Sequence, residues 1–140
     1  MFLGVRFLKL LFRYFPKIYL TINSIIYGIL VCLFIIDANT WFSNLGILPR
    51  EQVGLTELKT MYIGLMAAIG IFSILAVLFN QLQLAGLIFA LVSYSMLAAV
   101  RSYGMFVDGF SSDLMTQLVL AEIISAFLAL VALICRNKME

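Results

Sequence analysis

The stretch that decides the fold is MYIGLMAAIGIFSILAVLFNQLQLAGLIFALVSYSMLAAV, at residues 61–100. It contains no Asp, Glu, Lys or Arg, and the polar pair Asn80–Gln81 divides it near the middle. About 20 apolar residues are needed for a helix to cross the hydrocarbon core of a membrane. The stretch therefore predicts two membrane-spanning helices, at residues 61–79 and 82–100. Asn80 and Gln81 form a turn so short that the two helices must be antiparallel neighbours.

Two further apolar runs have the same length. Residues 18–36 are interrupted only by uncharged polar side chains, and residues 114–135 hold one carboxylate, Glu122. Because lipid offers no partners to backbone N–H and C=O groups, such runs must cross as helices. We therefore expect an all-α fold, an integral membrane four-helix bundle in which residues 1–140 form a single membrane domain. The expected spans are about 18–36, 61–79, 82–100 and 114–135.

Composition supports membrane insertion and excludes several function classes. Of the 140 residues, 64% are hydrophobic and 11% are charged, against about 45–50% and about 25% in soluble domains. A soluble domain of this size has too much surface to hide so many apolar side chains. The chain has no histidine, which excludes His-ligated haem, His-bearing zinc sites and Ser-His-Asp catalysis. No phosphate-binding loop or dinucleotide fingerprint occurs. We predict no metal and no cofactor, assign no catalytic residue, and favour a non-enzymatic protein.

The connecting segments carry their own signals. The first loop, Asp37–Thr60, holds apolar residues that are unusual in a free linker: Trp41, Phe42, Leu45, Ile47 and Leu48. We expect them to lie at the membrane interface, where Trp is favoured. After the third span, Asp113 is placed for the first turn of the fourth helix, where a carboxylate is stabilised by the helix dipole.

Basic residues predict the orientation. An even number of spans puts both termini on one side, and that side carries six of the nine basic residues, opposed only by Glu140: Arg6, Lys9, Arg13, Lys17, Arg136 and Lys138. The other side mixes charges: Arg50, Lys59, Arg101, Asp37, Glu51, Glu57, Asp108 and Asp113. Since Lys and Arg accumulate on the cytoplasmic side, both termini are predicted to be cytoplasmic. The net charge of +2 reflects this topology, and we infer no nucleic-acid partner from it.

The N-terminal segment, residues 1–17, has a distinct pattern. Arg6, Lys9, Arg13 and Lys17 recur every three or four residues among apolar side chains, which predicts an amphipathic helix with one basic stripe. We expect this helix to lie in the cytoplasmic interface and bind anionic lipid headgroups, with Pro16 turning the chain into the first span. A cleaved signal peptide is the alternative, but residues 36–38, Ile-Asp-Ala, offer no small-x-small cleavage site.

Cysteines and small residues are interpreted as packing features. Cys32 and Cys135 are predicted at different depths, which places them too far apart for a disulfide and indicates two buried free thiols. Small residues at four-residue spacing allow helix backbones to approach closely in lipid. Three such stripes occur: Gly64 and Ala68; Gly86 and Ala90; and Ala121, Ser125 and Ala129.

Glu122 is the residue that topology explains least. It lies eight residues inside the fourth span, about 12 Å deep at 1.5 Å per residue. A carboxylate near the middle of the bilayer costs about 2.5–3.5 kcal/mol, so it is expected to face protein and find a partner. Arg101, at the end of the third span, lies about 8 Å higher by the same arithmetic, which an Arg side chain can bridge.

Further polar residues are candidates for the same site. If the third helix continues through Gly104, Asp108 lies two turns beyond Arg101 on the same face. Glu57 stands at the outer entrance of the second span. The predicted outward-facing cluster comprises Glu57, Tyr62, Arg101, Asp108 and Glu122, with Tyr103 and Asn23 as further neighbours. Three roles stay open: an ion-pair clamp that fixes helix packing, a ligand or proton site, and a contact with a partner subunit.

The same residues carry a family resemblance. The stretches ELKTMYIGLMAAIG, residues 57–70, and AAVRSYGMFVDG, residues 98–109, resemble small four-span bacterial inner-membrane proteins of an uncharacterised family in the DoxX-like superfamily. In those proteins an acidic and basic pair precedes a Tyr-x-Gly helix start, and an Arg ends the third helix before Asp-Gly. Lys59 departs from the more usual Arg, and Ile63 from a frequent second Gly. The resemblance implies a four-helix fold and location in the bacterial inner membrane.

Function is less specified than fold. We expect an accessory subunit or a binder of a small amphipathic, lipid-like ligand, acting through the outward polar cluster. A redox or lipid-modifying subunit that acts on a quinone or lipid, with Glu122 as proton carrier, is one alternative. A small oligomeric transporter is another. The expected partners are the lipid bilayer and either a membrane protein or further copies of this chain.

Overall fold

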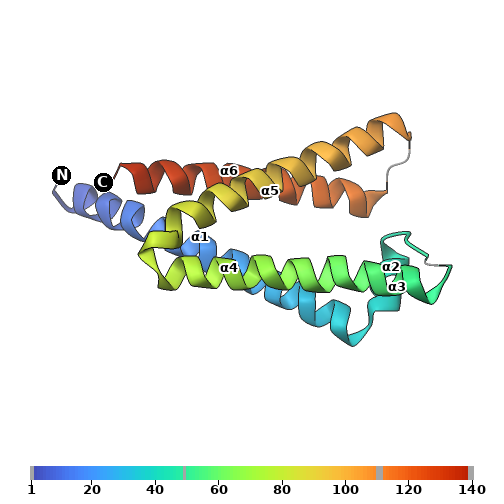
Figure 1. The fold of residues 1–140 in the computed structure, drawn as a ribbon. Helices are drawn as coiled ribbons and strands as arrows, with labels where there is room; N and C mark the ends of the chain where they lie inside the picture. The colour runs from blue at the N-terminus through green and yellow to red at the C-terminus, as the bar shows by residue number, and fades with distance from the viewer. Residues whose placement is uncertain (1, 49, 110–111, 139–140) are drawn as a thin grey trace. The chain divides into compact units, whose positions relative to one another are not determined.

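The computed structural model describes residues 2–48, 50–109 and 112–138 and, from residue 12 on, their side chains. This part of the chain is helical and contains no strand (Figure 1). Four of its helical stretches are long and apolar enough to cross a membrane: Phe12–Ile36, Gln52–Leu78, Asn80–Val107 and Asp113–Asn137. The prediction of an all-α fold with four long apolar helices is confirmed. The chain divides into two compact units: a first unit of Met1–Leu20 with Ala76–Glu140, and a second unit of Thr21–Leu75.

The helices extend beyond the predicted spans. The elements are α1 (Phe2–Ile36), α2 (Ala38–Asn44), α3 (Gln52–Lys59), the π-helix η1 (Thr60–Leu65), α4 (Met66–Leu78), α5 (Asn80–Val107) and α6 (Asp113–Asn137). Apolar runs mark only the part of a helix that fits the hydrocarbon core, whereas backbone hydrogen bonding continues into the interface. The long first loop is thus partly helical, and α3, η1 and α4 follow one another without a break.

The turn between the second and third spans falls at Phe79, so the prediction of Asn80 and Gln81 as the turn was wrong. Phe79 has an extended backbone (φ −108°, ψ 104°), and Asn80 already begins α5. The Leu82 N–H donates to the Phe79 carbonyl at 2.9 Å. One extended residue thus separates α4 from α5, and the side chains of Asn80 and Gln81 occupy the first turn of α5. Polar residues such as Asn80 and Gln81 can stand either in a turn or in the first turn of a helix, and the sequence alone does not distinguish these two positions.

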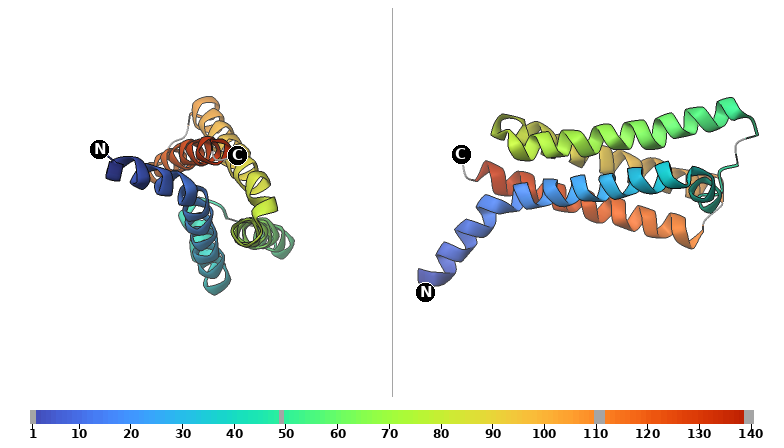
Figure 2. Two further views of the ribbon diagram at one scale, coloured as in Figure 1. Left: turned by 90° about the vertical axis from the view of Figure 1, so that its left-hand side faces the viewer. Right: turned by 90° about the horizontal axis from the view of Figure 1, so that it is seen from below.

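Pro16, which we expected to turn the chain into the first span, does not interrupt the helix. It lies inside α1, its side chain is fully buried, and the ribbon of α1 bends within its first half (Figure 2). Proline is a common cause of such bends because its ring displaces the preceding turn. The side chains of Arg6 and Lys9, and the residues Met1, Pro49, Ser111 and Glu140, lie outside what the structure describes. The basic amphipathic stripe therefore stays a prediction.

Both ends of the chain belong to the first unit. The first turns of α1 and the last turns of α6 lie at the same end of that unit (Figures 1 and 2). This arrangement is what an even number of crossings requires.

The first loop forms a small core of its own in the second unit. Phe34, Ala38 and Phe42 are buried, and Tyr62 packs with its ring centroid 5.1 Å from that of Phe34 and 5.3 Å from that of Phe42. The position of Trp41, Phe42, Leu45, Ile47 and Leu48 at the membrane interface stays a prediction. In the structure only Leu48 of these five is exposed, and the other four belong to this core or pack against it. The cause is α2, which begins at an N-cap where Asp37 accepts a hydrogen bond from the Thr40 N–H at 3.1 Å. Hydrogen bonds from Thr40 also hold the pKa of Asp37 below its ordinary value.

Neutral hydrogen bonds join α1 and α4 within the second unit. The Asn23 Nδ2 donates to the Ser73 Oγ at 2.8 Å, and the Ser24 Oγ donates to the Gly70 carbonyl at 2.9 Å. A Cβ on Gly70 would lie 3.3 Å from that of Tyr27, so the glycine permits this close approach. We call these two hydrogen bonds the neutral clamp.

The predicted stripes of small residues were partly wrong. Gly86, Ala90 and Ala129 are buried, but Gly64, Ala68 and Ala121 are exposed, and a Cβ on Gly64 would meet nothing within 4 Å. Cys135 is buried and free as predicted, whereas Cys32 is free but exposed. Small residues are tolerated on lipid-facing and packed faces alike, so their spacing does not identify the face. Many large apolar side chains are likewise exposed along the long helices, as in a protein surrounded by lipid.

Candidate functional site: a charged pair and a pocket between α5 and α6

Helices α5 and α6 pack against each other in the first unit (Figure 1). Buried residues recur at every fourth position along α5: Gly86, Ala90, Tyr94 and Ala98. Continuing this face toward the end of α5 leads to Arg101. On α6 the buried residues also lie on one face: Glu122, Ala129, Ala132 and Cys135. Helical periodicity therefore places Arg101 next to the buried face of α5, and Glu122 belongs to the buried face of α6.

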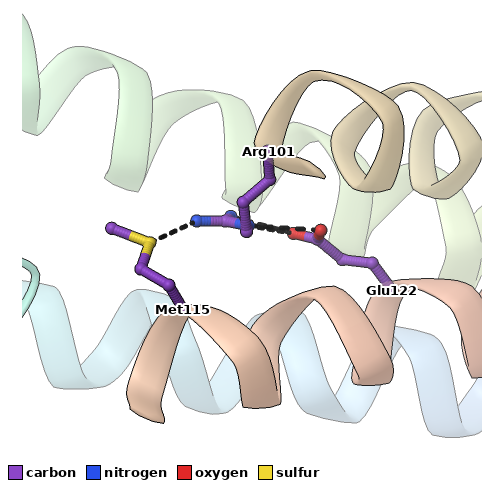
Figure 3. Close-up of polar contacts among 3 residues, drawn as sticks. All are labelled: Arg101, Met115 and Glu122. Atoms are coloured by element: carbon purple, nitrogen blue, oxygen red, sulfur yellow. Dashed lines mark hydrogen bonds and ion pairs between the residues drawn. The ribbon is translucent and has the colours of Figure 1, made fainter. Parts of the chain in front are cut away.

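Arg101 and Glu122 form a multiply hydrogen-bonded ion pair (Figure 3). The Arg101 Nη2 lies 2.8 Å from the Glu122 Oε1, and the Nε lies 3.2 Å from both carboxylate oxygens. This arrangement confirms the prediction that Arg101 lies within salt-bridge reach of Glu122. Arg–carboxylate pairs joined by several N–H groups are stronger and more specific in geometry than single contacts.

Burial of the pair is unequal. The Glu122 side chain is 9% exposed and the Arg101 side chain 26%. Glu122 lies well inside α6, in the part that is apolar enough to cross a membrane, so its negative charge requires a partner there. Arg101 supplies the opposite charge, and its side chain is partly exposed.

Met115 contacts the Arg101 guanidinium on the side away from Glu122. Its Sδ lies 3.4 Å from the Arg101 Nη1, on the side opposite the Glu122 carboxylate (Figure 3). A thioether is a weak acceptor, so the Nη1 N–H groups are not fully used. We did not predict this contact from the sequence. The available signal was spacing: Met115 precedes Glu122 by seven residues and so shares its helical face.

A pocket of about 390 Å³ lies beside the pair. It is lined by Leu97, Val100, Arg101, Gly104, Met105 and Asp108 of α5 and by Met115 of α6. α5 continues through Gly104 to Val107, the condition under which Asp108 was expected to share a face with Arg101. Asp108 is exposed, and within the described residues no ion pair involves it. Glu122 does not line the pocket and stands behind Arg101 as its counter-ion.

The structure thus brings together three of the five predicted cluster residues. Arg101, Asp108 and Glu122 lie in the first unit, whereas Glu57 and Tyr62 lie in the second. Glu57 is exposed on α3, and Tyr62 belongs to the aromatic core described above. Of the two further neighbours we expected, Tyr103 is exposed on α5, and Asn23 takes part in the neutral clamp.

The chemistry available at this site is recognition through polar groups beside an apolar wall. Among the described residues, no group of three His, Cys, Asp or Glu side chains is placed to hold a metal ion. Within that same part of the chain, each buried side-chain nitrogen or oxygen has a hydrogen-bond partner. The groups left for an incoming molecule are the partly exposed guanidinium and the exposed Asp108 carboxylate.

Comparison with known proteins returns no match: no family model, no curated protein and no solved structure is significantly similar to this chain. Its function must therefore be argued from the site itself.

Proposed function

We propose that this chain is a multi-pass membrane protein that binds a small amphipathic molecule in the pocket beside Arg101. The observation that carries the proposal is the pocket wall, which is apolar except for a guanidinium and a carboxylate. Its volume of about 390 Å³ falls within the range of about 300–1,000 Å³ common for small-molecule sites. An apolar wall with a few polar groups suits a molecule with a hydrocarbon part and a polar head.

Helix packing alone does not account for this arrangement. An ion-pair clamp needs only Arg101 and Glu122, which already satisfy one another. It does not require Asp108 on the same wall or open volume beside the guanidinium. Since Glu122 stands behind Arg101 and off the pocket wall, the arrangement also favours binding over proton transfer from Glu122 to a bound quinone or lipid. An accessory role beside a partner subunit, or transport by an oligomer, remains an alternative.

The location we propose follows from charge and resemblance. Four helices suited to crossing a membrane, together with six basic residues near the two ends of the chain, support a topology with both termini cytoplasmic. The resemblance of residues 57–70 and 98–109 to DoxX-like proteins supports the bacterial inner membrane and a four-helix bundle. A chain so placed would present the Arg101 pocket toward the outer side.

Filling the pocket tests the proposal. The protein is purified from native membranes in mild detergent, and bound amphiphiles are extracted and quantified per mole of chain. Gly104→Leu places a side chain in the pocket, so retained amphiphile should fall about tenfold, whereas Gly28→Leu, at a position where a Cβ meets nothing within 4 Å, should retain it.

Equal retention by the two variants would contradict the proposal. A stoichiometric protein that co-purifies in place of an amphiphile would favour the accessory-subunit role instead.

A further inference from the structure

The charges near the pocket are unbalanced. From residue 100 to residue 122 the chain carries one cation, Arg101, and three carboxylates, Asp108, Asp113 and Glu122, for a formal charge of −2. Glu122 neutralises Arg101 directly. What remains on the pocket wall is the negative charge of Asp108. This local field disfavours a head with net negative charge and favours one that contains a cation.

Arg101 nevertheless has hydrogen-bond donors to offer. A guanidinium carries five N–H groups, and here Nε and Nη2 serve Glu122, whereas Nη1 meets only the Met115 sulfur. An oxygen is a stronger acceptor than a thioether and would displace Met115 from Nη1. The pocket thus offers donors at Arg101 and an acceptor at Asp108.

The order of these groups along α5 is informative. Leu97 and Val100 supply apolar wall, Arg101 follows, and Asp108 lies at the end of the helix. A phospholipid with an amine in its head has the same order: hydrocarbon chain, phosphate oxygens, then nitrogen.

We infer that the amphipathic molecule is a lipid with a phosphoethanolamine head, an inference that rests on the proposed function. A phosphate or ester oxygen accepts from the Arg101 Nη1, the protonated amine donates to the Asp108 carboxylate, and the acyl chain lies along Leu97 and Val100. A choline head has no N–H to donate, and a glycerol head on a phosphate carries a net negative charge. The pocket therefore discriminates against both.

Lipid competition tests the inference. The purified chain is exchanged into vesicles with equal amounts of phosphatidylethanolamine, phosphatidylcholine and phosphatidylglycerol with identical acyl chains, re-extracted, and its retained lipids are quantified. The wild-type chain should enrich phosphatidylethanolamine about two- to fivefold over each competitor, the range expected for a partly exposed ion pair. Asp108→Asn should lose the preference over phosphatidylcholine, and Asp113→Asn, a matched carboxylate off the pocket wall, should keep it.

Each failure has a separate meaning. If the wild-type chain retains no more lipid of any kind than Gly104→Leu does, the proposed binding function is wrong. If it retains lipid without the phosphatidylethanolamine preference, or if Asp108→Asn keeps that preference, the phosphoethanolamine inference is wrong and the binding function stands.

Discussion

Two helix pairs in this chain are joined by polar contacts of opposite kinds. In the second unit the neutral clamp joins α1 and α4 through Asn23, Ser24 and Ser73, each less than 7% exposed. In the first unit Arg101 and Glu122 join α5 and α6 by an ion pair whose Arg side chain is 26% exposed. The residues of the neutral clamp are buried, whereas the Arg101 side chain of the charged pair is partly exposed and lines a pocket.

The neutral clamp and the charged pair differ in the free energy that their desolvation costs. Neutral hydrogen bonds between membrane helices contribute about 0.6 kcal/mol on average and require little desolvation. A charged pair loses several kcal/mol of hydration per ion before its attraction offsets the loss. The chain itself shows that neutral groups suffice to join two of its helices. The charged pair, which costs more to desolvate, is therefore better explained if Arg101 also contacts a bound molecule in addition to Glu122.

The largest effect should come from breaking the charged pair. Arg101→Ala leaves the Glu122 carboxylate buried without its partner, so thermal unfolding in detergent should show a loss of about 3 kcal/mol. The double variant Arg101→Met with Glu122→Leu removes both charges at similar volume and should recover most of that stability.

The double variant also sharpens the comparison. If the ion pair served packing alone, this variant would bind amphiphile as the wild-type chain does. If Arg101 contributes to the pocket, as we propose, the variant should fold and retain markedly less. An Arg101→Ala chain as stable as wild type would show that Glu122 finds other stabilisation.

An intermediate effect is expected where Gly86 of α5 approaches Ala76 of α4 in the first unit. A Cβ on Gly86 would lie 2.6 Å from the Ala76 Cβ, and both atoms are attached directly to helix backbones. Gly86→Ala should therefore force the end of α4 and the start of α5 apart, with a loss of about 1–3 kcal/mol in the same unfolding assay. Gly28→Ala is the matched control: its Cβ meets nothing within 4 Å, and alanine favours a helix, so stability should not fall. If Gly86→Ala lost no more stability than Gly28→Ala, the helices would be shown to move apart easily around the added Cβ at Gly86.

The sequence predicted the features that follow from local helix geometry, and it missed those that depend on contacts between distant parts of the chain. Apolar run length identified all four long helices, and depth arithmetic identified the Arg101–Glu122 pair, because both rest on a fixed rise per residue. The core around Phe42 could not be predicted, since it requires α2 to fold and return aromatic side chains onto Phe34. The pocket could not be predicted either, because its volume depends on how the side chains of α5 and α6 fill the space between them. Gly64 and Gly86 begin the same four-residue pattern yet lie on opposite kinds of face.

The smallest effect should come from the neutral clamp. Ser24→Ala removes the hydroxyl that donates to the Gly70 carbonyl, but that carbonyl keeps its own hydrogen bond within α4. No buried group is left without a partner, and alanine slightly favours α1, so the loss should be no more than about 0.6 kcal/mol. Ser73→Ala is the informative companion, because it removes the hydroxyl oxygen that accepts the 2.8 Å hydrogen bond from the buried Asn23 Nδ2, and it should cost more, about 1 kcal/mol. A loss at Ser24 as large as that of Arg101→Ala would remove the distinction between the two helix pairs, because a neutral contact would then hold the chain as firmly as the charged one.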